Sequence, residues 1–173
     1  HKPEKGIQCL GIFNEKTGKL EALPPKILNE MSKKYDIVLL EADGSRGLPC
    51  KGWLHNEPVV PDYCTHTVGI VTLNAVGKTA DESCVFRLKE FLSLTGLRQG
   101  EIITPATIEK MVCSSAGMFK NSAGELHIFV NQVESKETEE MAIELIKSIK
   151  AHYPGRFAGF AYGSARLNRW KEV

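Results

Sequence analysis

The sequence lacks a surplus of charge of either sign and a long apolar run. Its 22 lysine and arginine residues nearly balance 21 aspartate and glutamate residues, which gives a formal net charge of +1. No long-range field therefore favours nucleic acid or an anionic membrane. No stretch reaches the roughly 18 to 20 apolar residues of a membrane span, and the first residues, HKPEKG, lack the apolar core of a signal peptide. We expect a cytoplasmic protein with neither nucleic acid nor a membrane as partner.

Cysteine is present but unpatterned. The five cysteines are an odd number, are widely scattered and form no Cys-x-x-Cys or His-x-Cys cluster. This spacing argues against a disulfide framework or a structural zinc site and predicts reduced thiols. Four of them fit the role of small buried apolar residues. Cys50 differs because it lies in a polar stretch.

Several enzyme motifs are also missing. The sequence has no G-x-S-x-G elbow, no His-Glu-x-x-His and no G-x-G-x-x-G after a strand. The stretch LNAVGKT ends in Gly77-Lys78-Thr79, like a phosphate-binding loop, but Thr72 stands where that motif needs its first glycine. The residues ADES that follow delay the helix whose N-terminus would hold phosphates. We therefore predict a surface turn here, from which Lys78 would at most approach a ligand from the side.

The sequence does contain alternating strand and helix patterns. At 173 residues with 42% hydrophobic residues, the chain is large enough for one core, and we predict a single domain over 1–173. Apolar runs and turn signals predict a hairpin from 7–13 and 19–23, helices within 24–35, 81–96, 104–113 and 135–150, and buried strands at 36–42, 65–74, 125–131 and 156–165. This order indicates a layered α/β fold with a mostly parallel sheet and helices on both faces.

Polar residues follow three of these predicted strands. Glu41, Asp43, Ser45 and Arg46 come at the end of 36–42, Asn131 and Gln132 at the end of 125–131, and Ser164 at the end of the last strand. Ligands of such sheets gather at the carboxyl ends of the strands. We therefore expect these three strand ends to meet at one site.

Two patterns among these residues suggest a bound nucleotide. A buried strand that ends in an acid is typical of a carboxylate that orients Mg²⁺ beside phosphates, although such acids also pair with a nearby arginine, here Arg46. The stretch FVNQVES resembles the base-reading loop of GTP-binding proteins, with Asn131 and Glu134 at the base and Gln132 in place of the usual lysine. Ordinary turn chemistry explains the same residues. Both alternatives stay open.

Several longer stretches together indicate a family. EADGSRGLPCKGWLHNEPVVP, GIVTLNAVGK, FLSLTGL, ITP, GMFK and FVNQ occur in this order, and the chain resembles the selenium-dependent hydroxylase accessory proteins, the YqeC family, from residue 16 to its end. The resemblance implies a P-loop NTPase-like fold, here lacking the N-terminal phosphate-loop unit. Either that unit lies outside these 173 residues or this member has lost nucleotide hydrolysis. The family's His-Glu-Pro also appears here as Asn56-Glu57-Pro58, with His55 one position early.

The resemblance implies roles for individual residues. Glu41 and Asp43 would face Mg²⁺ and act in catalysis, while Gly44 and Gly47 would let the loop turn tightly. The remaining implied residues are Ser45, Arg46 and Lys51 as donors to an anionic ligand, Asn131, Gln132 and Ser164 as nucleotide contacts, and Glu57 in the loop. Arg46 and Lys51 have an alternative role as solvent-exposed loop charges or as partners of Glu57. For Cys50, a role in binding selenium or a metal stands beside the filler role. Trp53 fits a partly buried loop anchor better than a docking surface.

The function that the resemblance implies is maturation of a selenium-dependent molybdenum hydroxylase. The protein would bind Mg²⁺ with ATP or GTP and hydrolyse the nucleotide in its intact form, with the molybdenum hydroxylase or its maturation machinery as partner. The alternative is a non-catalytic module that docks a client enzyme or carries an anionic cofactor through residues 43–58. A glycine-rich GKT segment encoded upstream of His1 would distinguish the two.

Overall fold

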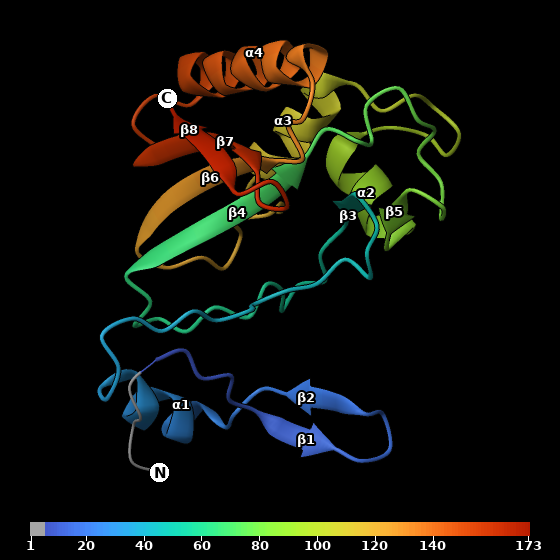
Figure 1. Ribbon diagram of the computed structural model, residues 1–173. Coiled ribbons are helices and arrows are strands. Elements are labelled where there is room, and N and C mark those ends of the chain that lie inside the picture. Colours follow the sequence, from blue (N-terminus) through green and yellow to red (C-terminus); the bar gives the residue numbers. More distant parts are fainter. Residues whose placement is uncertain (1–5) are drawn as a thin grey trace. The chain divides into compact units, whose positions relative to one another are not determined.

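The computed structural model describes residues 6–173, and the chain divides into two compact units, residues 1–41 and 42–173 (Figure 1). The sequence-based expectation of a single domain over 1–173 stays a prediction.

The first unit is a short hairpin followed by a helix. Strands β1 (Ile12–Asn14) and β2 (Lys19–Glu21) pair antiparallel, and Gly18 closes the turn with φ 66°, a conformation that glycine adopts without strain. Helix α1 (Pro25–Ser32) begins with proline in its first turn, where the missing N–H is not needed. The predicted hairpin and helix are confirmed, with shorter strands than expected. None of the side chains described in 6–41 is buried.

The buried strand predicted at 36–42 is wrong. These residues form no strand, and the side chains of Ile37 and Leu39 are 79% and 91% exposed. A continuous apolar run indicates burial on two faces, but it becomes a strand only where a neighbouring strand pairs with its backbone. No ladder of the described residues includes this segment.

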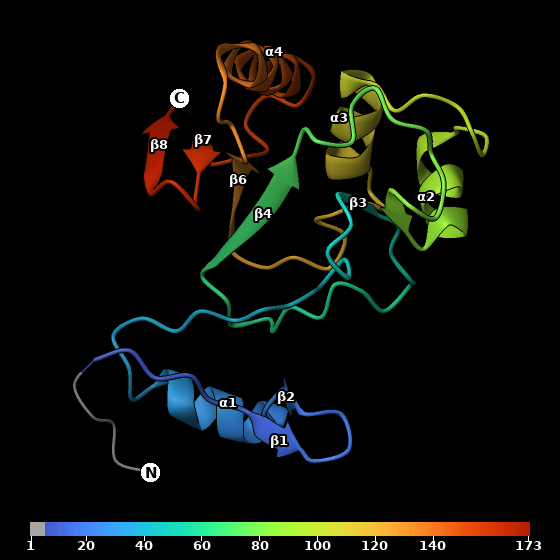
Figure 2. The same ribbon diagram turned by 45° about the vertical axis from the view of Figure 1, so that its right-hand side comes forward.

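The second unit contains a four-stranded sheet in the order β4-β6-β7-β8 (Figure 2). Strands β4 (His66–Thr72), β6 (Glu125–Asn131) and β7 (Gly159–Ser164) are parallel neighbours, and β8 (Arg169–Glu172) pairs antiparallel with β7. The short strands β3 (Cys50–Lys51) and β5 (Val85–Phe86) form a separate parallel pair. The mixed α/β class and the parallel-rich sheets agree with the sequence-based prediction.

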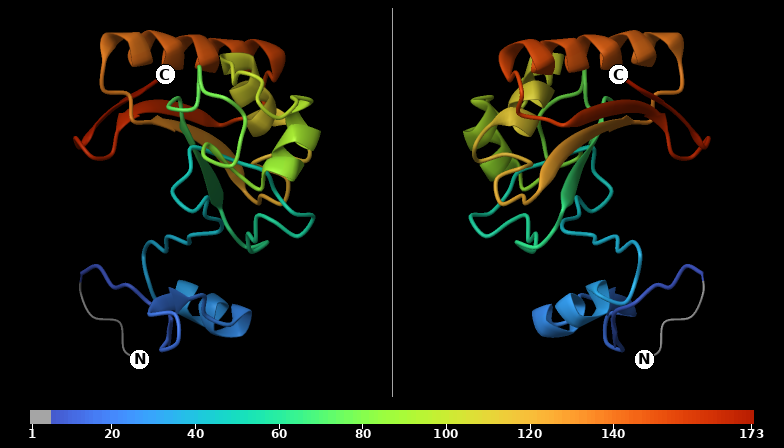
Figure 3. Two further views of the ribbon diagram at one scale, coloured as in Figure 1. Left: turned by 90° about the vertical axis from the view of Figure 1, so that its right-hand side faces the viewer. Right: turned by 90° about the vertical axis from the view of Figure 1, so that its left-hand side faces the viewer.

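Three helices complete this unit: α2 (Leu88–Thr95), α3 (Pro105–Cys113) and α4 (Lys136–His152) (Figure 3). Thr104 and Ser135 cap the predicted helices α3 and α4, since each side chain accepts a hydrogen bond from the backbone N–H three residues on. The helix predicted over 81–96 begins only at Leu88, because Val85 and Phe86 pair as strand β5. No helix among residues 6–173 is long and apolar enough to cross a membrane.

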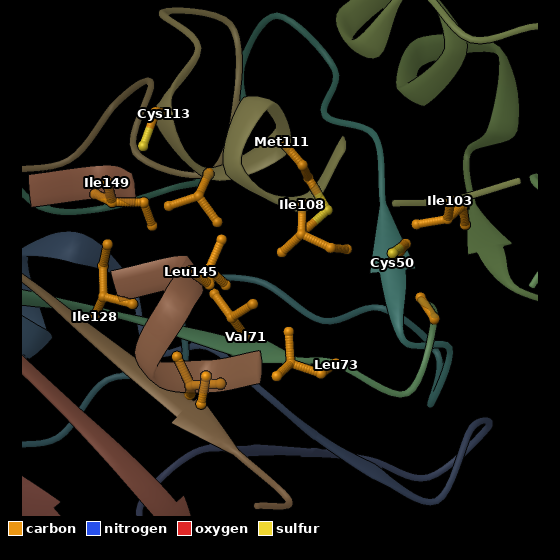
Figure 4. Close-up of a cluster of buried hydrophobic side chains, with 14 of the residues drawn as sticks. Cys50, Val71, Leu73, Ile103, Ile108, Met111, Cys113, Ile128, Leu145 and Ile149 are labelled. Atoms are coloured by element: carbon orange, nitrogen blue, oxygen red, sulfur yellow. The ribbon is translucent and has the colours of Figure 1, made fainter. Parts of the chain in front are cut away.

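The core of this unit lies between the sheet and helices α3 and α4. Figure 4 shows Ile108 and Met111 of α3 and Leu145 and Ile149 of α4 gathered with residues of β4 and β6. Along β4, the side chain of Val71 is buried in this core, whereas Val68 and Ile70 are 57% and 63% exposed. The alternation means that α3 and α4 pack on only one face of β4 and leave the other face exposed. The expected arrangement of helices on both faces of the sheet is therefore not found in this unit.

Candidate functional site

The loop from residue 43 to residue 58, called the 43–58 loop below, opens with a tight turn. Ser45 Oγ donates a hydrogen bond to the Leu48 carbonyl (2.7 Å), and the Leu48 N–H donates to the Ser45 carbonyl (3.1 Å). Gly47 adopts φ 78°, as its predicted turning role requires, while Arg46 adopts φ 55°, which non-glycine residues rarely do. The Ser45 hydroxyl therefore serves the turn itself.

A buried lysine lies at the centre of this loop. Lys51, on β3, is only 5% exposed, and its ammonium group contacts Asp43 Oδ1, the Gly44 carbonyl (3.0 Å) and Glu57 Oε2 (3.4 Å). A charge this far from water needs such partners, because desolvation of an isolated ammonium is very costly. The ion-pair alternative for Lys51 is thus what the structure shows.

Two residues that the sequence did not single out complete the group. Arg87 forms an ion pair with Glu57, and Phe86 is paired with Lys51 in the β3–β5 ladder. Three cationic groups surround the Phe86 ring, at 4.8 Å for Arg46, 5.4 Å for Lys51 and 5.0 Å for Arg87 from the ring centroid. The pattern VFR was assigned to a helix, so only the strand pairing reveals this cluster, which we call the Phe86 cation cluster.

The Arg46 guanidinium is the member of this cluster that has no ion pair among the described residues. Arg46 is exposed, whereas Lys51 and Arg87 are already neutralised by Asp43 and Glu57. With three cations and two carboxylates, the cluster has an excess of one positive charge. An anion that approaches from the solvent would therefore contact Arg46 before the other two cations.

Cys50, beside Lys51 on β3, is buried, as its filler role requires. Its side chain is 1% exposed, and burial raises the pKa of its thiol to about 12, with a smaller contribution from Cys84. Since the thiolate is the form that binds metals, burial of this thiol disfavours a ligand role. Trp53 is partly buried and packs against the core, as expected for a loop anchor.

A second group of predicted residues lies at the carboxyl ends of β4, β6 and β7. Asn131 Oδ1 accepts a hydrogen bond from the Ala165 N–H (3.0 Å), which ties the ends of β6 and β7 together. Gln132 Oε1 accepts hydrogen bonds from Thr72 Oγ1 and Asn74 Nδ2, each at 2.6 Å. The end of β4 thus takes the place at this edge that sequence reasoning gave to 36–42.

Glu134 connects this group to an arginine. The buried Ser164 donates its hydroxyl to Glu134 Oε1 (2.8 Å), and Arg166 pairs with the same carboxylate. The hydrogen bonds from Arg166 and then Ser164 lower the pKa of Glu134, so the carboxylate is firmly ionised. A pocket of about 380 Å³ is lined by Asn74, Gln132, Glu134, Ser135, Thr138 and Arg166.

The structure therefore places the predicted site residues in two groups. In the part of the chain that the structure describes, no hydrogen bond or ion pair joins the Phe86 cation cluster to the pocket at the carboxyl ends. Glu41 is exposed and belongs to the first unit, while Asp43 belongs to the second.

The stretch Gly77-Lys78-Thr79 is a turn, as predicted. Gly77 has φ 84°, Thr79 forms an isolated bridge with Ile102, and the next helix begins only at Leu88. Thr79 Oγ1 donates to Asp81 Oδ2, within the turn itself. No helix N-terminus follows that would hold phosphates.

Comparison with known proteins gives two matches. The family model described as "YqeC protein" matches residues 1–89, just over half of the 173 residues. The "Uncharacterized protein YqeC" of Escherichia coli (strain K12) is 25% identical to this chain over 148 residues, which cover 83% of this chain and 58% of that protein. The chain thus spans less than two thirds of this relative. No solved structure matches it.

Proposed function

The chain belongs to the YqeC family, and from this membership we propose that it acts as an accessory factor in the maturation of a selenium-dependent molybdenum hydroxylase and binds a nucleoside triphosphate. The hydroxylase role follows from the resemblance of the sequence motifs to that family. The nucleotide role is supported by a separate feature of this chain, its Phe86 cation cluster.

The observation that carries the nucleotide proposal is the guanidinium of Arg46, which forms no ion pair with any of residues 6–173. It lies 4.8 Å from the Phe86 ring centroid, next to Lys51 and Arg87, and its backbone has φ 55°. Such a conformation costs of order 1 kcal/mol or more and persists where the surroundings hold the residue in place. A planar guanidinium held at the surface with excess positive charge suits a phosphate group.

The pocket at the carboxyl ends of β4, β6 and β7 is the proposed base site. Its volume of about 380 Å³ is within the range of small-molecule sites, and its lining of amide, hydroxyl and charged groups suits a heterocyclic base. Ser164 would act by holding the wall of this pocket, since its hydroxyl already bonds to Glu134. Asn131 would act less directly, through its bond to Ala165, the residue before Arg166.

The Phe86 cation cluster suits phosphate groups better than it suits a magnesium ion. Asp43 already contacts the Lys51 ammonium, so a metal ion would compete with a buried cation for this carboxylate. We propose that Mg²⁺ enters with the triphosphate, which supplies most of its ligands. The roles of Glu41 and Asp43 in metal binding and hydrolysis belong to this proposal.

A non-catalytic function of the same loop is the second candidate. It is favoured by the turn at Gly77-Lys78-Thr79, which offers no phosphate-binding helix. In that case the Phe86 cation cluster would hold an anionic cofactor or an acidic segment of a client enzyme.

Titration with fluorescent ATP and GTP analogues, with and without Mg²⁺, tests the proposal. Arg46→Gln replaces the guanidinium with a neutral polar group on a similar side chain. We expect this variant to bind nucleotide about tenfold more weakly, as the loss of one charged contact does. Arg98→Gln, at another exposed arginine, is the control and should bind like the unaltered chain. Asp43→Asn leaves Lys51 its contact with Glu57, and we expect it to reduce the Mg²⁺-dependent part of the affinity.

Three outcomes would overturn the nucleotide role. These are no binding of either analogue by the complete gene product, equal affinities for Arg46→Gln and the unaltered chain, or equal losses in Arg46→Gln and Arg98→Gln. Binding of an acidic peptide or a cofactor phosphate in place of nucleotide, lost in Arg46→Gln, would establish the non-catalytic candidate.

A further inference from the structure

Three polar side chains come together at the other end of the sheet, at the amino ends of β4 and β6. His66 is the first residue of β4, and Glu125 and His127 are the first and third residues of β6. Parallel pairing sets His66 beside Glu125 and Val68 beside His127. Because side chains alternate along a strand, all three project from the same face, the one that carries exposed Val68 and Ile70.

The distances within this group are those of a metal site. Glu125 Oε2 lies 3.6 Å from His66 Nε2 and 3.8 Å from His127 Nε2, and the three ligand atoms all lie within 4.8 Å of one another. Ligand atoms that surround a zinc ion tetrahedrally at about 2.1 Å are about 3.4 Å apart. Small side-chain rotations would therefore close the group on an ion.

The ring nitrogen of His127 supplies a separate indication. Its Nε2 atom is buried and has no hydrogen-bond partner, although a buried polar atom normally has one. The nearest acceptor, Glu125 Oε2 at 3.8 Å, is too far for a hydrogen bond. A metal ion between these two atoms would satisfy both.

Neighbouring groups fix the two rings. His66 Nδ1 lies 2.9 Å from Thr65 Oγ1. In the tautomer in which Nδ1–H donates to this hydroxyl oxygen, Nε2 keeps the lone pair that a metal requires. A methyl group on Gly159 of β7 would lie 2.8 Å from His127 Nδ1, so this glycine makes room for the ring. The Glu125 N–H donates to the Thr65 carbonyl (2.9 Å), which holds the two strand starts together.

We propose that His66, Glu125 and His127 bind one divalent transition-metal ion of the zinc class. Two imidazoles and one carboxylate leave a coordination position for water or another ligand, as in catalytic zinc sites. The site uses no cysteine and lies apart from the residues of the proposed nucleotide site, so it goes beyond the proposed function. A surface ion pair of His and Glu alone would add little stability and would not need the third group.

The test is a titration of the chain, purified without a histidine tag, with Zn²⁺ by calorimetry and with Co²⁺ by visible absorption. We expect one tight ion per chain, and we expect His66→Ala, Glu125→Gln and His127→Ala each to weaken Zn²⁺ binding about 100-fold or more. Gly159→Ala removes no ligand but pushes on the His127 ring, so it should also weaken binding, by about tenfold. Circular dichroism would confirm that each variant is folded.

Two controls separate this site from other metal-binding groups. His152 forms a two-member pair with Glu109 (2.7 Å between His152 Nδ1 and Glu109 Oε1), so His152→Ala should leave the affinity for Zn²⁺ unchanged. Cys9→Ala removes an exposed thiol, and this variant should also bind Zn²⁺ with unchanged affinity. The proposal is overturned if the folded chain binds no Zn²⁺, if His66→Ala and His127→Ala bind as tightly as the unaltered chain, or if either control loses the ion.

Discussion

At the scale of single residues, burial decides the chemistry of Cys50, Cys84 and Cys113. The buried role predicted for Cys9 and Cys64 is wrong, since Cys9 is exposed and Cys64 half-buried. Desolvation raises the pKa of Cys50 and of Cys113 to about 12, from an ordinary value of 9.0. In the unfolded chain these thiols lose their protons near pH 9, whereas in the folded chain they keep them. Between about pH 9 and pH 12 the folded state therefore binds more protons than the unfolded state, so the free energy of unfolding falls as the pH rises through this range.

We predict that this loss is measurable at pH 10. At pH 10, one unit above its ordinary pKa, a thiol that ionises only in the unfolded chain should lower the free energy of unfolding by about 1.4 kcal/mol. Urea unfolding at pH 8 and pH 10 measures this loss. Between these two pH values, the free energy of unfolding should fall by that amount less in Cys50→Ala than in the unaltered chain. Cys9→Ala, at an exposed thiol, is the control and should keep the full dependence. Equal pH dependence in Cys50→Ala and the unaltered chain would contradict the assignment.

At the scale of elements, local signals predicted most helices and strands. The caps at Thr104 and Ser135 and the apolar runs of β4, β6 and β7 were readable because each is a local pattern. The segment 36–42 was not predictable in this way, since its apolar run is common to paired and unpaired segments. Strand β5 was missed for the opposite reason, because Val85 and Phe86 fit a helical pattern and only pairing with β3 makes them a strand.

The same distinction applies to the candidate sites. Asn131, Gln132 and Ser164 lie at strand ends and were predicted together, and Asp43 and Lys51 lie in one loop. Phe86 and Arg87 are more than 30 residues from that loop's start, so pairing had to be known first. The Glu125-x-His127 spacing is a period-two signal for one face of a strand, yet only the register of β4 and β6 adds His66.

Gly52 permits a close contact between the 43–58 loop and helix α2. A Cβ atom at this position would lie 2.6 Å from the Arg87 carbonyl and 2.7 Å from Glu90 Cβ, and would also overlap the Phe91 N–H. Backbone atoms cannot move aside as a flexible side chain does. We predict that Gly52→Ala lowers the free energy of unfolding by at least about 2 kcal/mol, as measured by urea unfolding.

A substitution on the exposed side of the same helix serves as the control for Gly52. Ser93 is exposed on α2, and Ser93→Ala should change the free energy of unfolding by no more than about 0.5 kcal/mol. A Gly52→Ala chain as stable as Ser93→Ala would show that the loop and the helix do not approach as closely as described.

At the scale of the whole molecule, stability is concentrated in one of the two units. Every buried apolar side chain of the described residues lies between Cys50 and Tyr162, within the unit of residues 42–173. The other unit offers a two-stranded hairpin and an eight-residue helix with no buried residue. Isolated hairpins and helices of this size are marginal in water, because they bury too little apolar surface to offset the entropy of ordering.

We therefore predict that residues 42–173 fold without residues 1–41. Thermal unfolding followed by circular dichroism should give a single transition for the shortened chain, within about 4 °C of the full chain, a shift equivalent to about 1 kcal/mol. The shortened chain should also retain Zn²⁺ binding, since His66, Glu125 and His127 all lie within it. A fall of more than 10 °C, or loss of the cooperative transition, would mean that the core described here is not sufficient, because the exposed apolar residues of 1–41 would then be contributing burial that stability requires.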